Sequence, residues 1–397
     1  MKAEFYKKKL KNGLTVLFEK RKFPVVSVSS SVKYGAAYES ASKKGISHFV
    51  EHLIFKGTKT RNHDEIAKEV EKKGGILNGF TSEELTSYWC KMPSKNINSG
   101  LDIVSDLILN PRFDDKDFEK EKKIIVEEIK MYHDNPAYYV PEKIKEMLYK
   151  KPFGESIAGG EEIIKNLTRS EARSLFNSVY TTDSMILAVV GDADFADICK
   201  KAEKIYPATK RKLIEFKAPR LNKEKIEKRR GLEQAHFVFG FHTPTMQEKK
   251  RYAYEAAMAY LADGMSSVLF REIREKRSLA YAVKGNLESG RDYGYAAIYS
   301  GTQKEKIKEI KEIILKEFKN LKNLKLKDLN EAKEQLIGNK KVVEEDSTMA
   351  MNILLEEEIA GSAFEYYKYE ERVNSIKLSD IRNIKLKTYS TFSLVPK

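Results

Sequence analysis

The chain has 397 residues, of which 41% are hydrophobic and 33% are charged. This balance is typical of a folded globular protein and excludes a disordered one, and the length predicts at least two domains. The net charge of +14 raises nucleic acid as a partner. Half of that excess lies in residues 210–230, where ten Lys or Arg and three Glu give a net +7 beside a proline. We therefore expect a solvated linker there and no nucleic-acid partner.

Membrane and export signals are absent from the sequence pattern. The most apolar run, residues 185–190, is far shorter than the roughly 20 residues that a membrane-spanning helix needs. The basic N-terminus, MKAEFYKKKLKNG, lacks the apolar segment of a secretory signal. Without an export signal, Cys90 and Cys199 are expected to be reduced core residues rather than a disulfide. These features predict a cytoplasmic protein with no membrane partner.

The first half begins with a strand-like run at 25–35 and an amphipathic stretch at 46–55. A glycine-containing turn, GGILNGF, then precedes a strand at 86–92 and a helix at 97–109. A Lys- and Glu-rich helix follows at 117–136. The mixture of periods near 2 and near 3.6 predicts an α+β domain.

The second half repeats this order. A strand at 235–244 leads through residues 252–281 to a strand at 293–301 and a helix at 304–321. We therefore predict two homologous α+β domains of about 200 residues each, with mainly antiparallel sheets and packed helices.

The boundaries of these domains follow from the charged segment between them. They are predicted at 1–209 for the first domain, 210–230 for a charged linker and 231–397 for the second domain. No histidine pair stands in the second copy, so the chemistry is assigned to the first.

The stretch GISHFVEHLIFKGT, residues 45–58, contains the strongest chemical signal. On a helix, His48 and His52 are spaced i,i+4 and can direct two imidazoles at one ion. A bare pair of this kind is more often two core histidines hydrogen-bonded to the backbone or to each other. Glu51 reverses that preference, because His-x-x-Glu-His is the signature of the inverted zincins.

A catalytic zinc takes three protein ligands and leaves a fourth position open, so a third ligand is expected downstream. Glu121 and Glu128 in the 117–136 helix are seven residues apart and share a face beside Ile124 and Ile125. Glu127 is expected to face solvent. For Glu121 the alternative is an exposed charge in a Lys/Glu-rich helix.

The blocks GISHFVEHLIFKGT, GGILNGFTSEELTSYW and EKEKKIIVEEIKMYHDNP together resemble the pitrilysin-type (M16) zinc metallopeptidases. The size and duplicated layout are similar to the short two-domain members related to mitochondrial processing peptidase. The resemblance implies one zinc ion per chain, bound by His48, His52 and Glu128. It also implies that Glu51 is the general base on a metal-bound water and that Glu121 orients a ligand histidine.

In the second half, FREIREKRSLAYAV places Arg274 and Tyr281 seven residues apart, on one helical face or across a helix end that turns back. Residue types alone favour a surface charge and a packed core aromatic. The resemblance implies instead that both contact substrate and help to stabilise the tetrahedral intermediate. Because one chain holds both sets of residues, we expect a homodimer in which Arg274 and Tyr281 act in trans.

Asn78, Gly79, Phe80 and Thr81 precede the strand at 86–92. A peptide substrate can pair with an edge strand there, and the resemblance places this segment beside the substrate. An ordinary hairpin turn at Asn-Gly is the alternative. The sequence thus predicts an endopeptidase acting on short or unfolded peptides in an enclosed chamber. The alternative from another class is a non-catalytic structural subunit of a larger assembly.

Overall fold

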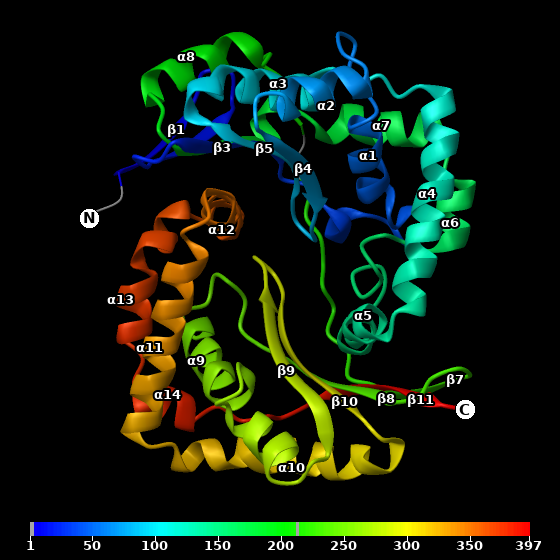
Figure 1. The fold of residues 1–397 in the computed structure, drawn as a ribbon, viewed down its shortest axis with the longest axis vertical. Helices are drawn as coiled ribbons and strands as arrows, with labels where there is room; N and C mark the ends of the chain where they lie inside the picture. Colours follow the sequence, from blue (N-terminus) through cyan, green and yellow to red (C-terminus); the bar gives the residue numbers. More distant parts are fainter. Residues whose placement is uncertain (1–3, 212–213) are drawn as a thin grey trace. The chain divides into compact units, whose positions relative to one another are not determined.

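The computed structural model describes residues 4–211 and 214–397. The chain divides into two compact units, each a mixed sheet covered by helices (Figure 1). The first unit consists of Met1–Ile129, Ser156–Phe216 and Val343–Tyr367, and the second of Lys130–Glu155, Lys217–Val342 and Lys368–Lys397. The predicted fold class, two α+β domains with mainly antiparallel sheets, is confirmed.

The sheet of the first unit has six strands. Their order is β1 (Glu4–Lys9), β2 (Thr15–Lys20), β6 (Met185–Gly191), β3 (Val25–Val32), β5 (Thr86–Pro93) and β4 (Ile76–Thr81). Only the pair β2 and β6 is parallel among these strands. The edge strand expected at 86–92 is in fact β5, which lies inside the sheet, and the edge is β4.

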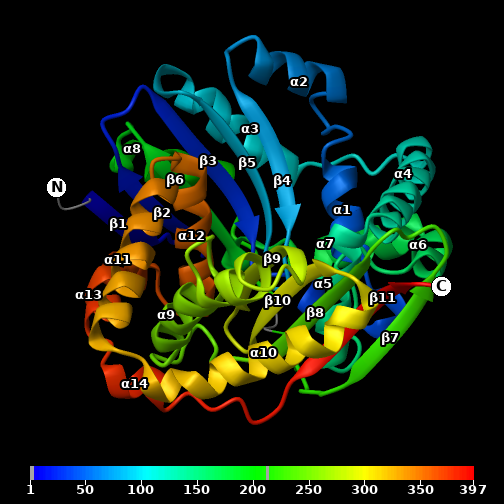
Figure 2. The ribbon, with the colours of Figure 1, turned by 60° about the horizontal axis from the view of Figure 1, so that its bottom comes forward.

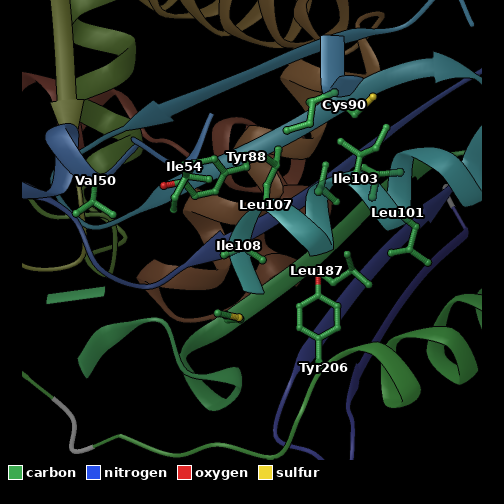
Figure 3. Packing of buried hydrophobic residues seen from close by; sticks show 14 of the residues in the cluster. Val50, Ile54, Tyr88, Cys90, Leu101, Ile103, Leu107, Ile108, Leu187 and Tyr206 are labelled. Carbon is green, nitrogen blue, oxygen red and sulfur yellow. The ribbon is translucent and has the colours of Figure 1, made fainter. Parts of the chain in front are cut away.

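One face of this sheet carries the larger core. Its helices include α1 (Ile46–Ile54), α2 (His63–Glu71), α3 (Ile97–Leu109), α4 (Asp115–Asp134), α7 (Arg169–Val179) and α8 (Phe195–Ile205). Alternate residues of β6, such as Leu187, point into this core and pack with Leu107 and Ile108 of α3 (Figure 3). Cys90 and Cys199 are buried here and unpaired, as predicted.

The opposite face of the sheet is covered by α12 (Ser347–Ala360), from the second half of the chain. Met351 and Leu355 pack against Ile186 of β6 in a separate apolar cluster. Ser27 of β3 fixes the start of this helix, because its Oγ lies 2.8 Å from Ser347 Oγ. The first sheet therefore takes its second cover from a segment more than 150 residues downstream of β6.

The sheet of the second unit has five strands. Their order is β7 (Glu224–Arg229), β11 (Ser390–Pro396), β8 (Ala235–His242), β10 (Gly294–Thr302) and β9 (Ala280–Ser289). One face packs on helices that include α9 (Arg251–Ala262), the π-helix Phe270–Glu275, α10 (Ile307–Asn320) and α14 (Leu378–Arg382). The other face is covered by α5 (Pro136–Leu148), which contacts β8 and β11. The remaining helices are α6 (Glu161–Asn166) in the first unit and α11 (Leu326–Val343) and α13 (Tyr369–Asn374), which belong mainly to the second.

Two findings differ from the contiguous halves and linker expected from the sequence. The first half supplies α5 to the second unit, and the second half supplies α12 to the first. Within the predicted linker, Glu224–Arg229 forms the edge strand β7, whose charged and mostly exposed side chains are typical of a sheet edge. Residues 212–213 of that linker lie outside the described residues. No helix in the described part of the chain has the length and apolar character needed to span a membrane.

Candidate metal centre

Helix α1 carries the histidine pair, and a buried carboxylate fixes where this helix starts. Glu39 accepts hydrogen bonds from the backbone N–H groups of Gly45 (2.8 Å) and Ser47 (2.6 Å), which have no partner inside the helix. Lys44 Nζ lies 3.9 Å from the Glu39 carboxylate, and both side chains are buried. Burial raises the pKa of Glu39 to about 7, against the opposing charge of Lys44. The first turn is therefore held in place ahead of His48.

Helix α4 brings a carboxylate to the same point. Glu128 Oε1 lies 3.8 Å from His48 Nε2, and Glu128 Oε2 lies 3.5 Å from His52 Nε2. One ligand atom from each of the three residues falls within 4.8 Å of the others. Two ligands bound tetrahedrally to one zinc ion lie about 3.4 Å apart, given zinc–ligand distances of about 2.0–2.2 Å. Among residues 4–211 and 214–397, no other group of His, Cys, Asp or Glu side chains converges in this way.

The two histidines differ in their electrostatic surroundings. Burial, together with the neighbouring His52, lowers the pKa of His48 to about 3. His48 is therefore neutral at physiological pH, with a lone pair available for a metal. Burial also acts to lower the pKa of His52, but the hydrogen bond to Glu121 and the charges of Glu128 and Glu51 outweigh it, so this pKa is raised in the metal-free protein.

Glu121 lies behind His52. Its Oε2 is 3.2 Å from His52 Nδ1, and its Oε1 is 2.7 Å from Lys56 Nζ. Burial acts to raise the pKa of Glu121, but the hydrogen bonds with His52 and Lys56 hold it below the usual range. A carboxylate on Nδ1 fixes the tautomer that leaves Nε2 free, which is the arrangement found behind metal-binding histidines. The two imidazole nitrogens and the Glu128 carboxylate, with His52 oriented by Glu121, fit a zinc ion.

The burial of the residues around Glu121 and Glu128 can be compared with the helical face predicted for α4. Glu121 is buried, Glu127 is exposed and Glu128 is half-buried, as the helical spacing predicted. Ile125 packs in the core, whereas Ile124 is 40% exposed. Only one of the two isoleucines expected beside the carboxylates is therefore buried.

Glu51 lies on α1 beside the ligand cluster and is 8% exposed. Thr81 Oγ1 donates a hydrogen bond to Glu51 Oε2 at 2.5 Å. Burial raises the pKa of Glu51, and the Thr81 hydrogen bond opposes that rise. A buried carboxylate with one fixed donor and one remaining oxygen is suited to accept a proton from a neighbouring water.

Thr81 belongs to the segment predicted to bind substrate. Asn78, Gly79, Phe80 and Thr81 all lie in β4, so they form an edge strand and not a hairpin turn. The turn comes after them, where the Ser82 N–H donates to Leu85 O. The outer side of β4 has no neighbouring strand in the described structure, which leaves room for an added strand.

Arg274 and Tyr281 belong to the second unit. Arg274 lies on the π-helix, where its guanidinium stacks 4.9 Å from the Phe270 ring centroid and its side chain is 47% exposed. Tyr281 lies on β9 and is 52% exposed, so it is not a packed core aromatic. The two residues flank a helix end that turns back at Ser278 (φ +50°) and do not share one helical face.

Three partners in the metal centre were not predicted from the sequence. Lys56 follows His52 at i+4, a spacing that could have indicated its position beside the ligands. Glu39 caps α1 from a separate loop, and the Thr81–Glu51 hydrogen bond joins residues 30 positions apart. No local sequence signal marks these two contacts.

Comparisons with known proteins place the chain in a peptidase family. A family model described as "Insulinase (Peptidase family M16)" matches residues 15–161, and one described as "Peptidase M16 inactive domain" matches residues 166–336. An "Uncharacterized zinc protease" of Rickettsia felis is 32% identical over 99% of this chain and 97% of its own length. "Uncharacterized zinc protease YmxG" of Bacillus subtilis is 31% identical over 86% of this chain and 85% of its own length.

Solved structures share the fold. A protease from Helicobacter pylori has a TM-score of 0.91 at 22% identity, covering 99% of this chain and 100% of its own. A putative M16-like peptidase from Alicyclobacillus acidocaldarius has a TM-score of 0.84 at 15% identity, covering 100% and 99%. From the two family models and from relatives matched over almost its whole length, we conclude that this chain belongs to the M16 peptidase family.

Proposed function

We propose that this chain is a zinc-dependent endopeptidase whose metal is held by His48, His52 and Glu128. The observation that carries the proposal is the convergence of His48 Nε2, His52 Nε2 and a Glu128 oxygen, with Glu121 on the far nitrogen of His52. The relatives named as zinc proteases support the zinc-protease part of the proposal.

Each residue has a defined role in this proposal. Bound zinc supplies Lewis acidity, which polarises a peptide carbonyl and makes water more acidic. Glu51 removes the proton from the attacking water and then passes it to the nitrogen of the leaving amine. Thr81 holds the Glu51 carboxylate in one orientation, and Glu121 holds the His52 ring in one orientation.

The substrate proposed is a short or unfolded peptide. Edge strand β4 can pair through its backbone only with an extended chain, which favours peptides over folded proteins. Such pairing is largely independent of the substrate's side chains. Asn78 to Thr81 are proposed to contact the backbone of the bound peptide. The enclosed chamber and the cytoplasmic location expected from the sequence stay predictions.

Arg274 and Tyr281 are proposed to contact the substrate and stabilise the charge that develops on the carbonyl oxygen. Their exposure leaves both side chains accessible to a ligand. We further propose a homodimer in which the two residues act in trans. Mixing Glu51→Gln chains with Tyr281→Phe chains should regain activity if they do, and a mixture as inactive as its components would exclude completion in trans.

The central test combines metal content with peptide hydrolysis. Purified protein should contain about one zinc ion per chain and cleave a fluorogenic peptide, and a chelator should abolish that cleavage. Glu51→Gln should keep the zinc and lower kcat by about 10³-fold or more. A wild-type protein that binds zinc but cleaves no peptide would favour the alternative, a non-catalytic structural subunit. An active Glu51→Gln protein would remove Glu51 from the role of base.

A further inference from the structure

Tyr281 occupies an irregular position in the sheet of the second unit. Strands β9, β10 and β8 lie side by side there (Figure 2). Along the β9–β10 pair, Ala280 faces Thr302 and Ala282 faces Gly301, so Tyr281 is left without a partner residue on β10. It is the extra residue of a β-bulge, and bulges redirect side chains and occur next to active sites.

The Tyr281 ring lies against the β10 backbone at Gly301. A Cβ atom on Gly301 would come within 2.4 Å of ring atoms Cε1 and Cζ of Tyr281, and within 2.6 Å of its hydroxyl oxygen. Real Cβ atoms do not approach other atoms so closely, so this ring position requires glycine at 301. The bulge and the glycine together fix where the Tyr281 hydroxyl lies.

Two further polar side chains, Tyr299 and His236, lie beyond Tyr281 on the same face of the sheet. Tyr299 lies two residues before Gly301 on the same face of β10, the face on which the Tyr281 ring rests, and interaction with Tyr281 helps to raise the pKa of its hydroxyl. The Tyr299 hydroxyl also lies 2.7 Å from Nδ1 of His236. His236 lies on β8 directly opposite Gly301. Tyr281, Tyr299 and His236 therefore lie side by side across three neighbouring strands on one face of the sheet.

The three side chains differ in their exposure to solvent, and Tyr281 is the most exposed of them. Tyr281 is 52% exposed, whereas Tyr299 and His236 are half-buried. Burial and the hydrogen bond to Tyr281 raise the pKa of Tyr299 above its usual range, and burial lowers the pKa of His236. Tyr299 thus stays protonated and His236 stays neutral at physiological pH.

We propose that Tyr299 and His236 are positioning residues that hold the Tyr281 hydroxyl as a donor to the carbonyl oxygen of a bound peptide. In this proposal Tyr281, Tyr299 and His236 form a hydrogen-bonded relay. Its hydrogen bonds can all point in one of two directions, and only one of these leaves the Tyr281 hydrogen free for a ligand. In that direction His236 Nδ1–H donates to the Tyr299 oxygen, and the Tyr299 O–H donates to the Tyr281 oxygen. Aligned hydrogen bonds polarise one another, so Tyr281 becomes a stronger donor.

This inference rests on the proposed function, because it gives Tyr281 a role toward substrate. Its test is a double-mutant cycle on the full chain with a fluorogenic peptide. Tyr281→Phe should lower kcat by about 10²-fold, as removal of one oxyanion donor does. Tyr299→Phe should lower kcat by about threefold to tenfold with KM changed less than about twofold, and should have no further effect in the Tyr281→Phe background.

Matched variants separate positioning from packing. Tyr295→Phe removes a hydroxyl that donates to Glu288 from the same face of β10, and it should leave kcat unchanged. His236→Asn keeps a donor near the Nδ1 position and should retain more activity than His236→Leu. Melting temperatures of all variants check that the fold is intact.

The possible outcomes are distinct. The relay would be overturned if the decreases in kcat caused by Tyr299→Phe and Tyr281→Phe multiplied in the double mutant. It would also be overturned if Tyr299→Phe and Tyr295→Phe changed kcat equally. Either result would leave the peptidase assignment in place. An unaltered kcat in Tyr281→Phe would overturn the substrate role of Tyr281 and the relay with it. Activity in Glu51→Gln would instead contradict the proposed mechanism at the metal centre.

Discussion

The two units of this protein share one strand order. In the first unit β2, β6, β3, β5 and β4 are neighbours in that sequence, and in the second β7, β11, β8, β10 and β9 follow the same plan. The single parallel pair stands at the same place in both, between β2 and β6 and between β7 and β11. The first unit adds only β1 at its outer edge. One scaffold has therefore been used twice.

The units differ at the helix between the central strand and the outer hairpin. In the first, α1 follows β3, is capped by buried Glu39 and carries the histidine pair. In the second, α9 follows β8, has Lys250 at its N-cap without a side-chain hydrogen bond, and contributes to no converging group of metal ligands among the described residues. Chemistry thus depends on side chains placed on the shared scaffold and not on the scaffold itself.

The edge strands differ in a related way. Thr81 at the end of β4 contacts Glu51, whereas Tyr281 near the start of β9 is the extra residue of a bulge and its ring lies against Gly301. The first edge strand supplies a hydrogen bond to Glu51, beside the candidate metal ligands of its own unit. The second carries Tyr281, a half-exposed aromatic residue with no metal ligand beside it in the described residues.

Separating the halves at the predicted boundary should prevent folding of the first unit, because residues 1–209 lack α12. The face of β6 that packs on Met351, Leu354 and Leu355 would be exposed. Burying one such side chain contributes about 1.5–3 kcal/mol, so the loss is on the order of 5–10 kcal/mol, comparable with the stability of a typical domain. Thermal denaturation followed by circular dichroism should show no cooperative transition.

The matched control joins residues 343–367 to the same fragment through a flexible linker, which should restore the transition. Cooperative unfolding of residues 1–209 alone, at the midpoint of the linked form, would show that the exchange of α12 is not needed for stability.

Replacing Glu121 with Gln should weaken zinc binding in the first unit. The substitution removes the charge that holds His52 Nδ1 and pairs with Lys56, and changes of this kind cost about 10–100-fold in metal affinity. Competition with a chromogenic chelator measures the affinity. Glu127→Gln, an exposed change on the same helix, is the control and should bind zinc as the wild type does. Equal affinities in the two variants would leave Glu121 without a role at the metal.

Replacing Gly301 with Ala should lower activity through the second unit alone. The added methyl group displaces the Tyr281 ring, so kcat should fall by about tenfold while zinc content stays unchanged. Steady-state kinetics and metal analysis together measure this. Gly338→Ala in α11 is the control, because a Cβ atom there meets nothing within 4 Å. A full kcat in Gly301→Ala would show that the ring position does not matter for catalysis.

The cap of α1 should make stability depend on pH. Burial raises the pKa of Glu39 from 4.5 to about 7, so the folded protein binds this proton more tightly than the unfolded chain. The resulting stabilisation is complete below pH 4.5 and is lost as the pH rises through 7. Glu39→Gln should reduce the fall in melting temperature between about pH 5 and about pH 8, because no carboxyl remains to titrate.

The same substitution should destabilise the protein by about 1 kcal/mol at low pH, since the amide NH₂ faces a backbone N–H. Glu65→Gln, at the exposed capping box of α2, is the control and should keep the pH dependence of the wild type. An identical pH dependence in Glu39→Gln and the wild type would exclude Glu39 as its source.

Much of the fold was predictable because it depends on local periodicity. The apolar spacing predicted α1, α3, α4 and α10, and alternation predicted β3, β5, β8 and β10, each within a few residues of its observed ends. The placing of His48, Glu51 and His52 on one helical turn also followed from spacing alone. The choice of Glu128 over Glu121 as the third ligand did not, and depended on the family resemblance.

Sequence by itself therefore determined the elements, the duplicated plan and the residue types of the metal centre, because a period of 3.6 or 2 decides which side chains share a face. Tertiary structure alone decided the reciprocal exchange of α5 and α12, the Glu39 cap, the Thr81–Glu51 hydrogen bond and the contact between Tyr299 and His236. These contacts join residues far apart in the sequence. They form only when strands and helices pack, and no local pattern encodes which distant groups then meet.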